Sequence, residues 1–461
     1  MSTTSQARFS LRRLRAELAG QVIAPDDPEY DAARSVFFPA FDRRPAAIVR
    51  PLDAAEVVSV VALARDSGLE LAVRSGGHSA AGHGVSEGGI VLDLSCLKAL
   101  EIDADRRVAW AETGLTAGEV TRAAAAHGLG VSFGDTGSVG IGGLTLGGGV
   151  GYLVRKHGLT IDSLLAADIA TADGRLLRVD AERHPDLFWA IRGGGGNFGV
   201  ATRFQYRLHP VDSATGGMLI LPATPETIAS FIVAAEEAPD ELSTIANVVP
   251  APPLPFVPEE HRGRLVVMAM LLHAGPSEAG QRALAPFRAL AAPIVDLLRP
   301  MSYEETYPPE NGMRSLVAAR TMFVDTVDRG AAAEILAQLG TSGARMPVAQ
   351  LRVLGGAMAR VPAEATAFAH RRRRILVNLA AVYATRDEAH VHEAWLADAA
   401  ASLRQGDDDA YVNFLGDEGP ERVRAAYPGW TWERLTAVKR RYDPENLFRV
   451  NQNVPPTGEL G

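Results

Sequence analysis

The densest glycine array of the chain lies between Gly140 and Gly151 and holds seven glycines in twelve residues. Such a run lets successive backbone N–H groups face one point, and a nest of this kind can hold a pyrophosphate without a lysine. A flexible linker is the alternative, but linkers carry Ser, Pro and charged residues. Here Ile141, Leu144 and Leu146 lie between the glycines. The sequence therefore predicts a packed loop that binds an anion.

The composition of the 461 residues is typical of a globular protein, with 47% hydrophobic and 22% charged residues. At roughly 150 residues per domain, this length predicts two or three domains. The net charge of −9, without a basic stripe, argues against a nucleic-acid partner. No apolar run reaches the roughly 20 residues that span a bilayer, and no apolar segment follows the N-terminal arginines. We therefore expect a cytoplasmic protein without a membrane partner.

The first 200 residues alternate between short strands and helices. Short apolar runs bounded by turn residues predict strands at residues 47–49, 71–73 and 90–92. One predicted helix covers residues 53–64 behind an Asp53 cap. A second covers residues 116–127, where Thr116 and Glu119 have the spacing of a capping box. This alternation indicates an α+β or α/β fold.

The pattern changes from about Val211, where glycines become sparse and longer elements are predicted. The predicted strands are residues 265–272, 351–358 and 375–383. Two helices are predicted at residues 225–235 and 277–285, and we expect Pro286 to end the second one. The run Arg371 to Arg374 is interpreted as a solvated basic loop.

A formal G-x-G-x-x-G pattern occurs at Gly194, Gly196 and Gly199. The dinucleotide fingerprint requires a strand before the pattern and a helix after it. Here the predicted helix, 184–192, precedes the pattern and the predicted strand, 200–208, follows it. The sequence therefore disfavours a nicotinamide-binding Rossmann domain, and it contains no P-loop motif.

The segment Arg74 to Ser79, Arg-Ser-Gly-Gly-His-Ser, follows the predicted strand 71–73 and places His78 on a glycine-rich turn. An isolated histidine in such a turn is more often structural than reactive. The local sequence alone leaves both roles open.

Taken together, these motifs resemble those of the FAD-linked oxidases of the vanillyl alcohol oxidase superfamily, in the berberine bridge enzyme-like branch. Five separated motifs in family order carry the resemblance: Arg74 to Ser79, Gly140 to Gly151, Ala167 to Ile169, His184 to Gly199, and Tyr442 to Pro456. The resemblance implies an α+β, two-domain PCMH-type FAD-binding fold. Residues 1–211 and 409–461 would form the FAD-binding domain, and residues 212–408 an inserted substrate-binding domain with an antiparallel sheet flanked by helices.

The resemblance also implies a covalent bond between His78 and the 8α-methyl group of FAD. The implied cofactor-binding residues are Arg74, Ser75, Gly76, Gly77, His78, Ser79, Thr136, Val139, Gly140, Gly142, Gly143, Gly147, Gly149, Gly151, Val200, Asn451 and Asn453. Many relatives carry a second bond through a cysteine at the position of Thr136. The only cysteine, Cys96, lies far from it in sequence, so we predict a single attachment. Val139 coincides with a position that gates oxygen in similar enzymes, although a packed aliphatic residue is an equal alternative.

Hydride transfer from an alcohol or amine to a flavin calls for a base within hydrogen-bond reach of the substrate. The segment Tyr411-Val412-Asn413 resembles the Tyr-x-Asn segment of the family, so Tyr411 is the candidate base, and Asn413 would orient Tyr411 or touch the flavin. The phenol pKa of about 10 would have to be lowered or matched by concerted proton transfer. The alternative is that Tyr411 only anchors an interdomain strand through its hydroxyl. His370 also lies in a family-like segment, where we expect a structural role.

The resemblance implies an FAD-dependent oxidase of secondary metabolism. Hydride would pass from an alcohol or amine carbon of a small metabolite to the flavin, and O2 would be reduced to H2O2. A dehydrogenase with another electron acceptor and a catalytically silent flavin-binding protein stay open. No metal site is expected, and the protein would be a monomer or homodimer. Substrate identity is not predicted, and four residues are candidates for the pocket only because they lie in the insert: Tyr303, Arg314, Arg320 and Tyr383.

Overall fold

The structure is a computed structural model that describes residues 10–308 and 314–459. The N-terminal part forms a four-stranded sheet in the order β1-β2-β4-β3, in which β1 is antiparallel and the other strands are parallel. Its strands are Gln21–Ile23 (β1), Ala47–Arg50 (β2), Leu71–Arg74 (β3) and Ile90–Asp93 (β4). Because parallel strands end at the same edge of a sheet, Arg74 and Asp93 meet there and form an ion pair of 2.9 Å.

Two helices of this part begin where the sequence predicts them. Helix α3 (Ala54–Ser67) connects β2 to β3, and the Asp53 carboxylate accepts hydrogen bonds from two N–H groups of its first turn. Helix α4 (Ala117–Ala125) begins with the predicted capping box of Thr116 and Glu119. Such caps satisfy N–H groups that have no partner inside the helix. The three short predicted strands are confirmed as β2, β3 and β4.

A five-stranded antiparallel sheet follows in the order β5-β6-β10-β8-β9. Its strands are Leu100–Asp103 (β5), Val108–Glu112 (β6), Leu164–Ala170 (β8), Leu176–Asp180 (β9) and Val200–Arg207 (β10). Two short strands pair separately, Leu129–Gly130 (β7) and His209–Pro210 (β11). The short helices of this part are Leu11–Glu17 (α1), Tyr30–Arg34 (α2), Ile141–Gly147 (α5), Val154–His157 (α6) and Pro185–Ala190 (α7).

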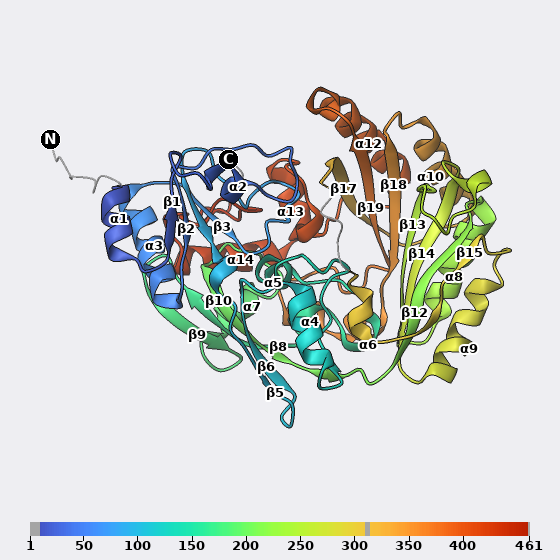
Figure 1. Ribbon diagram of the computed structural model, residues 1–461, viewed down its shortest axis with the longest axis horizontal. Coiled ribbons are helices and arrows are strands. Elements are labelled where there is room, and N and C mark those ends of the chain that lie inside the picture. Colours follow the sequence, from blue (N-terminus) through green and yellow to red (C-terminus); the bar gives the residue numbers. More distant parts are fainter. Residues whose placement is uncertain (1–9, 309–313, 460–461) are drawn as a thin grey trace.

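The C-terminal segment returns to this N-terminal half, where the red helices α13 (Pro420–Ala426) and α14 (Trp430–Tyr442) lie among blue and green elements (Figure 1). The fully buried Lys439 of α14 pairs with Asp443 at 2.7 Å and donates to the carbonyl oxygen of Asn197 at 2.8 Å. A buried ammonium group is tolerated only when its hydrogen bonds are satisfied. This lysine therefore fixes the returning segment to the glycine-rich stretch before β10.

Residues 214–383 form an eight-stranded antiparallel sheet in the order β15-β12-β14-β13-β18-β19-β17, with β16 also paired to β12. Its strands are Ala214–Pro222 (β12), Leu242–Pro250 (β13), Leu265–Ala274 (β14), Val295–Asp296 (β15), Arg299–Met301 (β16), Leu316–Val324 (β17), Met346–Val353 (β18) and Ile375–Tyr383 (β19). The helices that accompany it are Pro225–Glu237 (α8), Ser277–Arg288 (α9), Arg329–Thr341 (α10) and Ala389–Leu403 (α12). Figure 1 shows α8, α9 and α10 on the side of the sheet away from the N-terminal half, and α12 beside β17 and β19 at the top of the view.

Alternate residues of this sheet face opposite sides, as the period of a strand requires. In β19, Val377 and Leu379 belong to the apolar core shared with the helices, whereas Asn378 and Ala380 between them face a cavity. Strand β18 behaves in the same way, since Leu351 lies in the core between two cavity-lining neighbours. One face of the sheet therefore builds a core and the other builds a pocket wall.

Two predicted element ends are wrong. The predicted strand 351–358 stops at Val353, and residues Gly356–Arg360 form helix α11. Gly355 and Gly356 turn the chain there, with φ values of +107° and +56° that favour glycine. Pro286 does not end its helix, because α9 continues to Arg288. A proline removes one hydrogen bond, and near the C-terminal end of a helix that loss is small.

The glycine array is not a loop throughout. Residues Ile141–Gly147 form helix α5, and the sequence prediction of a loop is wrong for them. The interleaved Ile141, Leu144 and Leu146 are buried, and this apolar packing outweighs the low helix propensity of glycine. The chain leaves the helix at Gly148 and Gly149, where φ is +134° and +80°.

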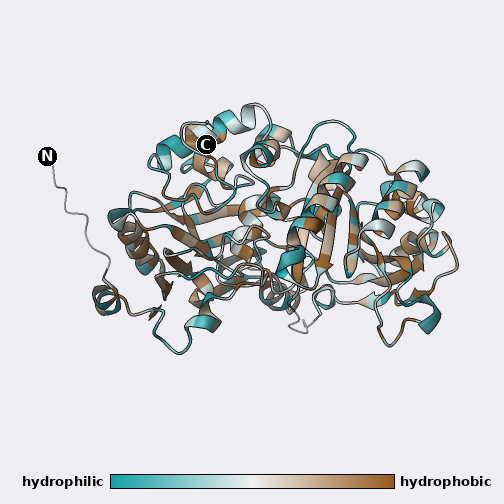
Figure 2. Cartoon of the chain, turned by 90° about the horizontal axis from the view of Figure 1, so that it is seen from above, coloured by the Kyte–Doolittle hydropathy of each residue, from teal (hydrophilic) through white to brown (hydrophobic). Residues whose placement is uncertain are grey.

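The strands and helices together confirm the predicted α+β class. Hydrophobic residues are concentrated on the strands, and hydrophilic residues on loops and outer helix faces (Figure 2). Across residues 10–308 and 314–459, every helix is too short or too polar to cross a bilayer. The division into residues 1–211, 212–408 and 409–461, the cytoplasmic location and the oligomeric state stay predictions.

Candidate active site

A cavity of about 500 Å³ lies between the N-terminal half and the eight-stranded sheet. Most predicted site residues line it, namely Arg74, Ser75, Gly76, Gly77, His78, Ser79, Thr136, Val139, Gly140, Gly142, Gly143, Gly149, Val200, Tyr411, Asn413 and Asn451. The opposite wall consists of Val317, Ala319, Gln350, Arg352, Asn378 and Ala380 from strands β17, β18 and β19. The cavity therefore combines segments from the start, the middle and the end of the chain.

Three predicted cofactor-binding residues lie outside this wall. A Cβ atom at Gly147 would lie 2.0 Å from Asn413 Oδ1, and one at Gly151 would lie 1.4 Å from the Phe133 carbonyl oxygen. Both glycines are therefore required by close packing inside the protein. The third residue, Asn453, has a buried Oδ1 atom without a hydrogen-bond partner among the described residues.

The candidate lining residues of the insert lie elsewhere too. Tyr303 donates a hydrogen bond to the Val131 carbonyl oxygen, and Tyr383 stacks on a histidine of α12. Arg320 forms an ion pair of 3.5 Å with Glu418. Arg314 lines a neighbouring cavity of about 780 Å³, which shares the segment Arg74 to His78 with the first one.

The turn after β3 is packed against the segment before α5. A Cβ atom at Gly76 would lie 2.3 Å from the backbone nitrogen of Gly140, and one at Gly140 would lie 2.1 Å from Ser75 Oγ. Gly77 has φ +73°, so the chain turns back sharply before His78. Only glycine permits this backbone contact and this turn. Gly76 and Gly140 are therefore required because the two segments touch.

Tyr411 is buried beside the cavity, immediately before the short 3-10 helix Val412–Phe414 (η7). Its Oη atom accepts hydrogen bonds from the Gly149 N–H group at 2.8 Å and from Asn413 Nδ2 at 3.0 Å. Burial raises the pKa of Tyr411 to about 12, although Gly149, Asn413 and the Arg352 charge act in the opposite direction. The phenol is therefore neutral near pH 7, surrounded by groups that would stabilise its anion.

Arg352 is a residue of the site that the sequence analysis missed. Its buried guanidinium pairs with Asp135 at 2.6 Å, donates to Gln350 Oε1 at 2.7 Å and lies 5.0 Å from the centre of the Phe414 ring. Asp135 comes from the N-terminal half and Arg352 from β18, so the pair joins the two walls. Two polar residues, Gln350 and Arg352, spaced by two in an apolar strand were the available signal.

Two histidines differ in their relation to the cavity. His83 lines it, and its pKa is lowered to about 4 by burial and by the nearby Arg43 charge, so it is neutral at pH 7. The sequence analysis missed this residue. His370 does not line the cavity: its ring bonds to Asp409 Oδ2 at 3.2 Å and to the Ala426 carbonyl oxygen at 3.0 Å. These contacts match the structural role expected for His370.

The run Arg371 to Arg374 is not wholly solvated, which corrects the sequence interpretation. Arg371 is fully buried and binds Asp162 through two hydrogen bonds of 2.7 and 2.8 Å. A bidentate guanidinium–carboxylate pair supports such burial. Asp162 precedes β8, so this ion pair is a second polar connection between the two halves.

Comparisons with known proteins identify relatives of this chain. Residues 45–180 match the family model described as "FAD binding domain", and residues 410–455 match the one described as "Berberine and berberine like". (R)-6-hydroxynicotine oxidase of Paenarthrobacter nicotinovorans is 32% identical, over 96% of this chain and 98% of the relative. YgaK, an uncharacterized FAD-linked oxidoreductase of Bacillus subtilis, is 28% identical, over 96% of this chain and 98% of the relative.

A solved structure gives the same result for the fold. The crystal structure of 6-hydroxy-D-nicotine oxidase from Arthrobacter nicotinovorans superposes with a TM-score of 0.84 at 29% identity. The match covers 95% of this chain and 98% of that one. It confirms the predicted fold class, in which helices are combined with antiparallel sheets.

Proposed function

This chain belongs to the berberine bridge enzyme-like family of FAD-linked oxidoreductases, and from that membership we propose a specific activity. The protein is proposed to be an oxidase that removes hydride from an alcohol or amine carbon of a small metabolite. The hydride acceptor is FAD bound covalently to His78, and O2 is the final electron acceptor. The observation that carries the proposal is the cavity in which His78, Tyr411 and Asn378 meet.

The residues of the cavity fit FAD. Arg74 Nη1, a donor, and Asn451 Oδ1, an acceptor, are buried without partners among the described residues. A ligand that carries both a diphosphate and ring N–H groups offers partners for both atoms. Gly143 lines the cavity, is exposed, and has nothing within 4 Å of a Cβ atom built there, which leaves room for close approach of such a ligand. A bound FAD would supply the hydride acceptor and pass two electrons on to O2.

We further propose that His78 makes the single covalent attachment and that Thr136 makes none. Both residues line the cavity, and Cys96 is exposed. A threonine hydroxyl lacks the reactivity of a thiolate, so the second bond of many relatives has no counterpart here. Val139 lies in the same wall, where its small side chain supports access of O2.

Tyr411 is proposed as the base that takes the proton from the substrate hydroxyl or amine. The two groups that contact its Oη atom are N–H donors, which favour the phenolate form. Asn413 is the positioning residue, since its Nδ2 atom also donates to the Leu144 carbonyl oxygen at 3.0 Å. The active form of Tyr411 is then the phenolate, whose population rises with pH.

The side chains of the sheet wall are suited to an uncharged, partly apolar substrate. Val317, Ala319 and Ala380 are small and apolar, and the charge of Arg352 is paired with Asp135. Asn378 Oδ1 is buried without a partner among the described residues, so it offers an acceptor for a substrate O–H or N–H group. Residues 212–408, which contain this wall, are proposed to form the substrate-binding domain.

The test uses the purified full-length protein. Its yellow colour should stay with the polypeptide after acid precipitation, and anaerobic addition of alcohols and amines should identify a substrate that bleaches it. Mixing the reduced protein with aerated buffer should then restore the colour and produce H2O2 in stopped flow. Release of all pigment into the acid supernatant would show that the flavin is not covalently bound. Negligible reaction of the reduced protein with O2 would mean that the protein is a dehydrogenase and not an oxidase.

A further inference from the structure

Residues 35–42, here called the strap, cross the cavity wall next to His78. The Phe37 N–H group donates a hydrogen bond of 3.1 Å to the Gly77 carbonyl oxygen. The Phe37 ring stacks on the His78 imidazole with ring centres 4.0 Å apart and an angle of 23° between the planes. Both residues line both cavities.

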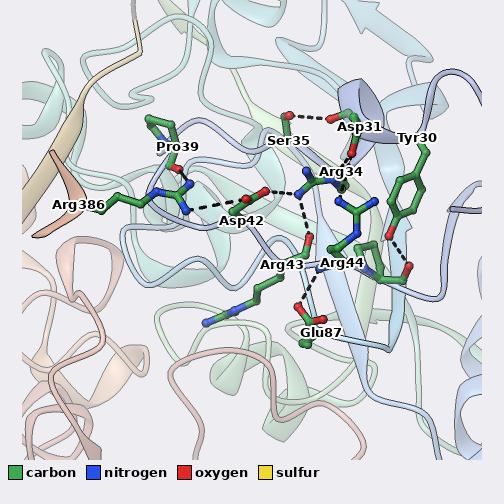
Figure 3. Close-up of polar contacts among 11 residues, drawn as sticks. Tyr30, Asp31, Arg34, Ser35, Pro39, Asp42, Arg43, Arg44, Glu87 and Arg386 are labelled. Atoms are coloured by element: carbon green, nitrogen blue, oxygen red, sulfur yellow. Dashed lines mark hydrogen bonds and ion pairs between the residues drawn. The ribbon is translucent and has the colours of Figure 1, made fainter. Parts of the chain in front are cut away.

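The strap is held from two sides. Arg386, in the 3-10 helix Arg386–Glu388 (η6) beyond the eight-stranded sheet, donates to the Pro39 carbonyl oxygen at 2.7 Å and lies 3.8 Å from Asp42. Asp42 also pairs with Arg34 of helix α2 in the N-terminal half. Figure 3 shows this chain of contacts, with Asp42 between the two arginines.

A third anchor lies close to the stacked ring. Arg314 precedes β17, and its Nη1 atom donates a hydrogen bond to the Val36 carbonyl oxygen at 3.2 Å. The residue before Phe37 is therefore fixed to the sheet half, while Phe37 itself is fixed to Gly77. Both contacts hold the peptide group between Val36 and Phe37, which fixes the point from which the Phe37 side chain reaches His78.

The imidazole of His78 is thus constrained in two different ways. Ser138 Oγ forms a hydrogen bond of 2.9 Å with Nε2, which fixes one point of the ring. The flat face of Phe37 limits tilting of the ring plane about that contact. The two contacts together define both the position and the plane of the imidazole.

We propose that Phe37 is a positioning residue for the bond between His78 and FAD. This inference rests on the proposed covalent attachment. Formation of that bond joins an imidazole nitrogen to the 8α-carbon and replaces one C–H bond and one N–H bond. The two electrons and two protons released reduce O2 to H2O2. A nitrogen that attacks a carbon needs defined distance and orientation, and small misplacement slows such reactions by large factors.

The experiment measures attachment, without any substrate. Apoprotein made in a riboflavin-deficient host is mixed with FAD in aerated buffer, and flavin fluorescence of the denatured polypeptide is followed on gels. Total FAD bound before denaturation is measured in parallel. Phe37→Leu keeps an apolar side chain but removes the flat face, and it should attach FAD about 10- to 100-fold more slowly with unchanged total binding. Phe37→Tyr keeps the face and should attach FAD at the rate of the unchanged protein.

The matched control is Phe41→Leu, a change of the same residue type in the same strap. The Phe41 ring packs against Gly82 and does not line the cavities, so attachment should keep its normal rate. Equal attachment rates in Phe37→Leu and in the unchanged protein overturn the inference. So does a parallel loss of total and covalent FAD, because the strap would then only close the cavity. If the unchanged protein itself attaches no FAD, the proposed covalent bond fails instead.

Discussion

The two walls of the cavity are built in different ways. On the N-terminal side, backbone meets backbone, as where Gly76 lies against Gly140. On the sheet side, the wall consists of side chains that project from alternate positions of β17, β18 and β19. A backbone contact tolerates no added atom, whereas a projecting side chain can change without moving its strand. The N-terminal wall is therefore constrained by the fold itself, whereas the sheet wall is open to variation.

The largest expected effect is a methyl group added to the backbone contact. Gly76→Ala places a Cβ atom 2.3 Å from the Gly140 nitrogen, so the two segments must separate. We expect the free energy of unfolding to fall by about 3 kcal/mol and FAD binding to be lost. Urea unfolding and the flavin absorbance of purified protein measure both.

A glycine in the sheet half serves as the control for this change. Gly340 lies in α10, and a Cβ atom there would meet nothing within 4 Å. Gly340→Ala should therefore stabilise the protein by about 0.5 to 1 kcal/mol through helix propensity. If Gly76→Ala behaves like Gly340→Ala, the N-terminal wall is not a tight backbone contact.

The second prediction concerns Tyr411, which belongs to the returning segment between the two walls. Its pKa is raised to about 12 by burial, so the phenol is neutral at lower pH and the phenolate appears only as the pH rises. We therefore expect kcat/KM to rise about tenfold per pH unit between pH 7 and 10. Tyr411→Phe should lower kcat/KM about 100-fold and flatten this profile.

Tyr427 provides the control, because it is equally buried but lies outside the cavity wall. Its Oη atom has no partner among the described residues, so Tyr427→Phe should leave the pH profile unchanged. A profile that is already flat in the unchanged protein would exclude Tyr411 as the base, and the hydroxyl would then only anchor its segment.

The third prediction tests the ion pair that joins the two walls. Asp135→Asn leaves the Arg352 guanidinium buried without its carboxylate partner, so we expect a loss of about 2 kcal/mol in the free energy of unfolding. The double change Asp135→Asn and Arg352→Met removes both charges and should recover part of that loss. Additive losses in the double variant would show that the pair does not couple the walls.

The glycine-rich geometry of the N-terminal wall was largely predictable from sequence because its constraint acts locally. Gly76, Gly77 and His78 are adjacent in the chain, and glycine pairs reveal backbone contacts directly. The prediction failed inside the glycine array, where buried Ile141 and Leu144 make residues of α5 helical. That packing depends on partners far away in sequence.

The sheet half was hard to predict for the opposite reason. Burial of Arg371 depends on Asp162, about 200 residues earlier in the chain, and no local pattern connects them. Arg352 likewise needs Asp135, and a lone arginine in a strand gives no sign of its partner. Only the alternation along β18 and β19 pointed to a two-faced sheet. Phe37 carried no signal, since its contact with His78 depends on how the strap is anchored.

The smallest expected effect concerns Asn378 in the sheet wall of the cavity. Asn378 Oδ1 is buried without a partner among the described residues, and strand neighbours hold its backbone in place. Asn378→Ala should leave the stability of the protein unchanged. It should raise KM about tenfold for a substrate that donates a hydrogen bond, because a tenfold change corresponds to roughly one hydrogen bond in binding. Asn378→Asp keeps an acceptor oxygen at the same place and should restore KM. An unchanged KM in Asn378→Ala would mean that another residue of this wall binds the substrate. A fall in stability comparable to that of Gly76→Ala would mean that both walls are equally constrained by the fold.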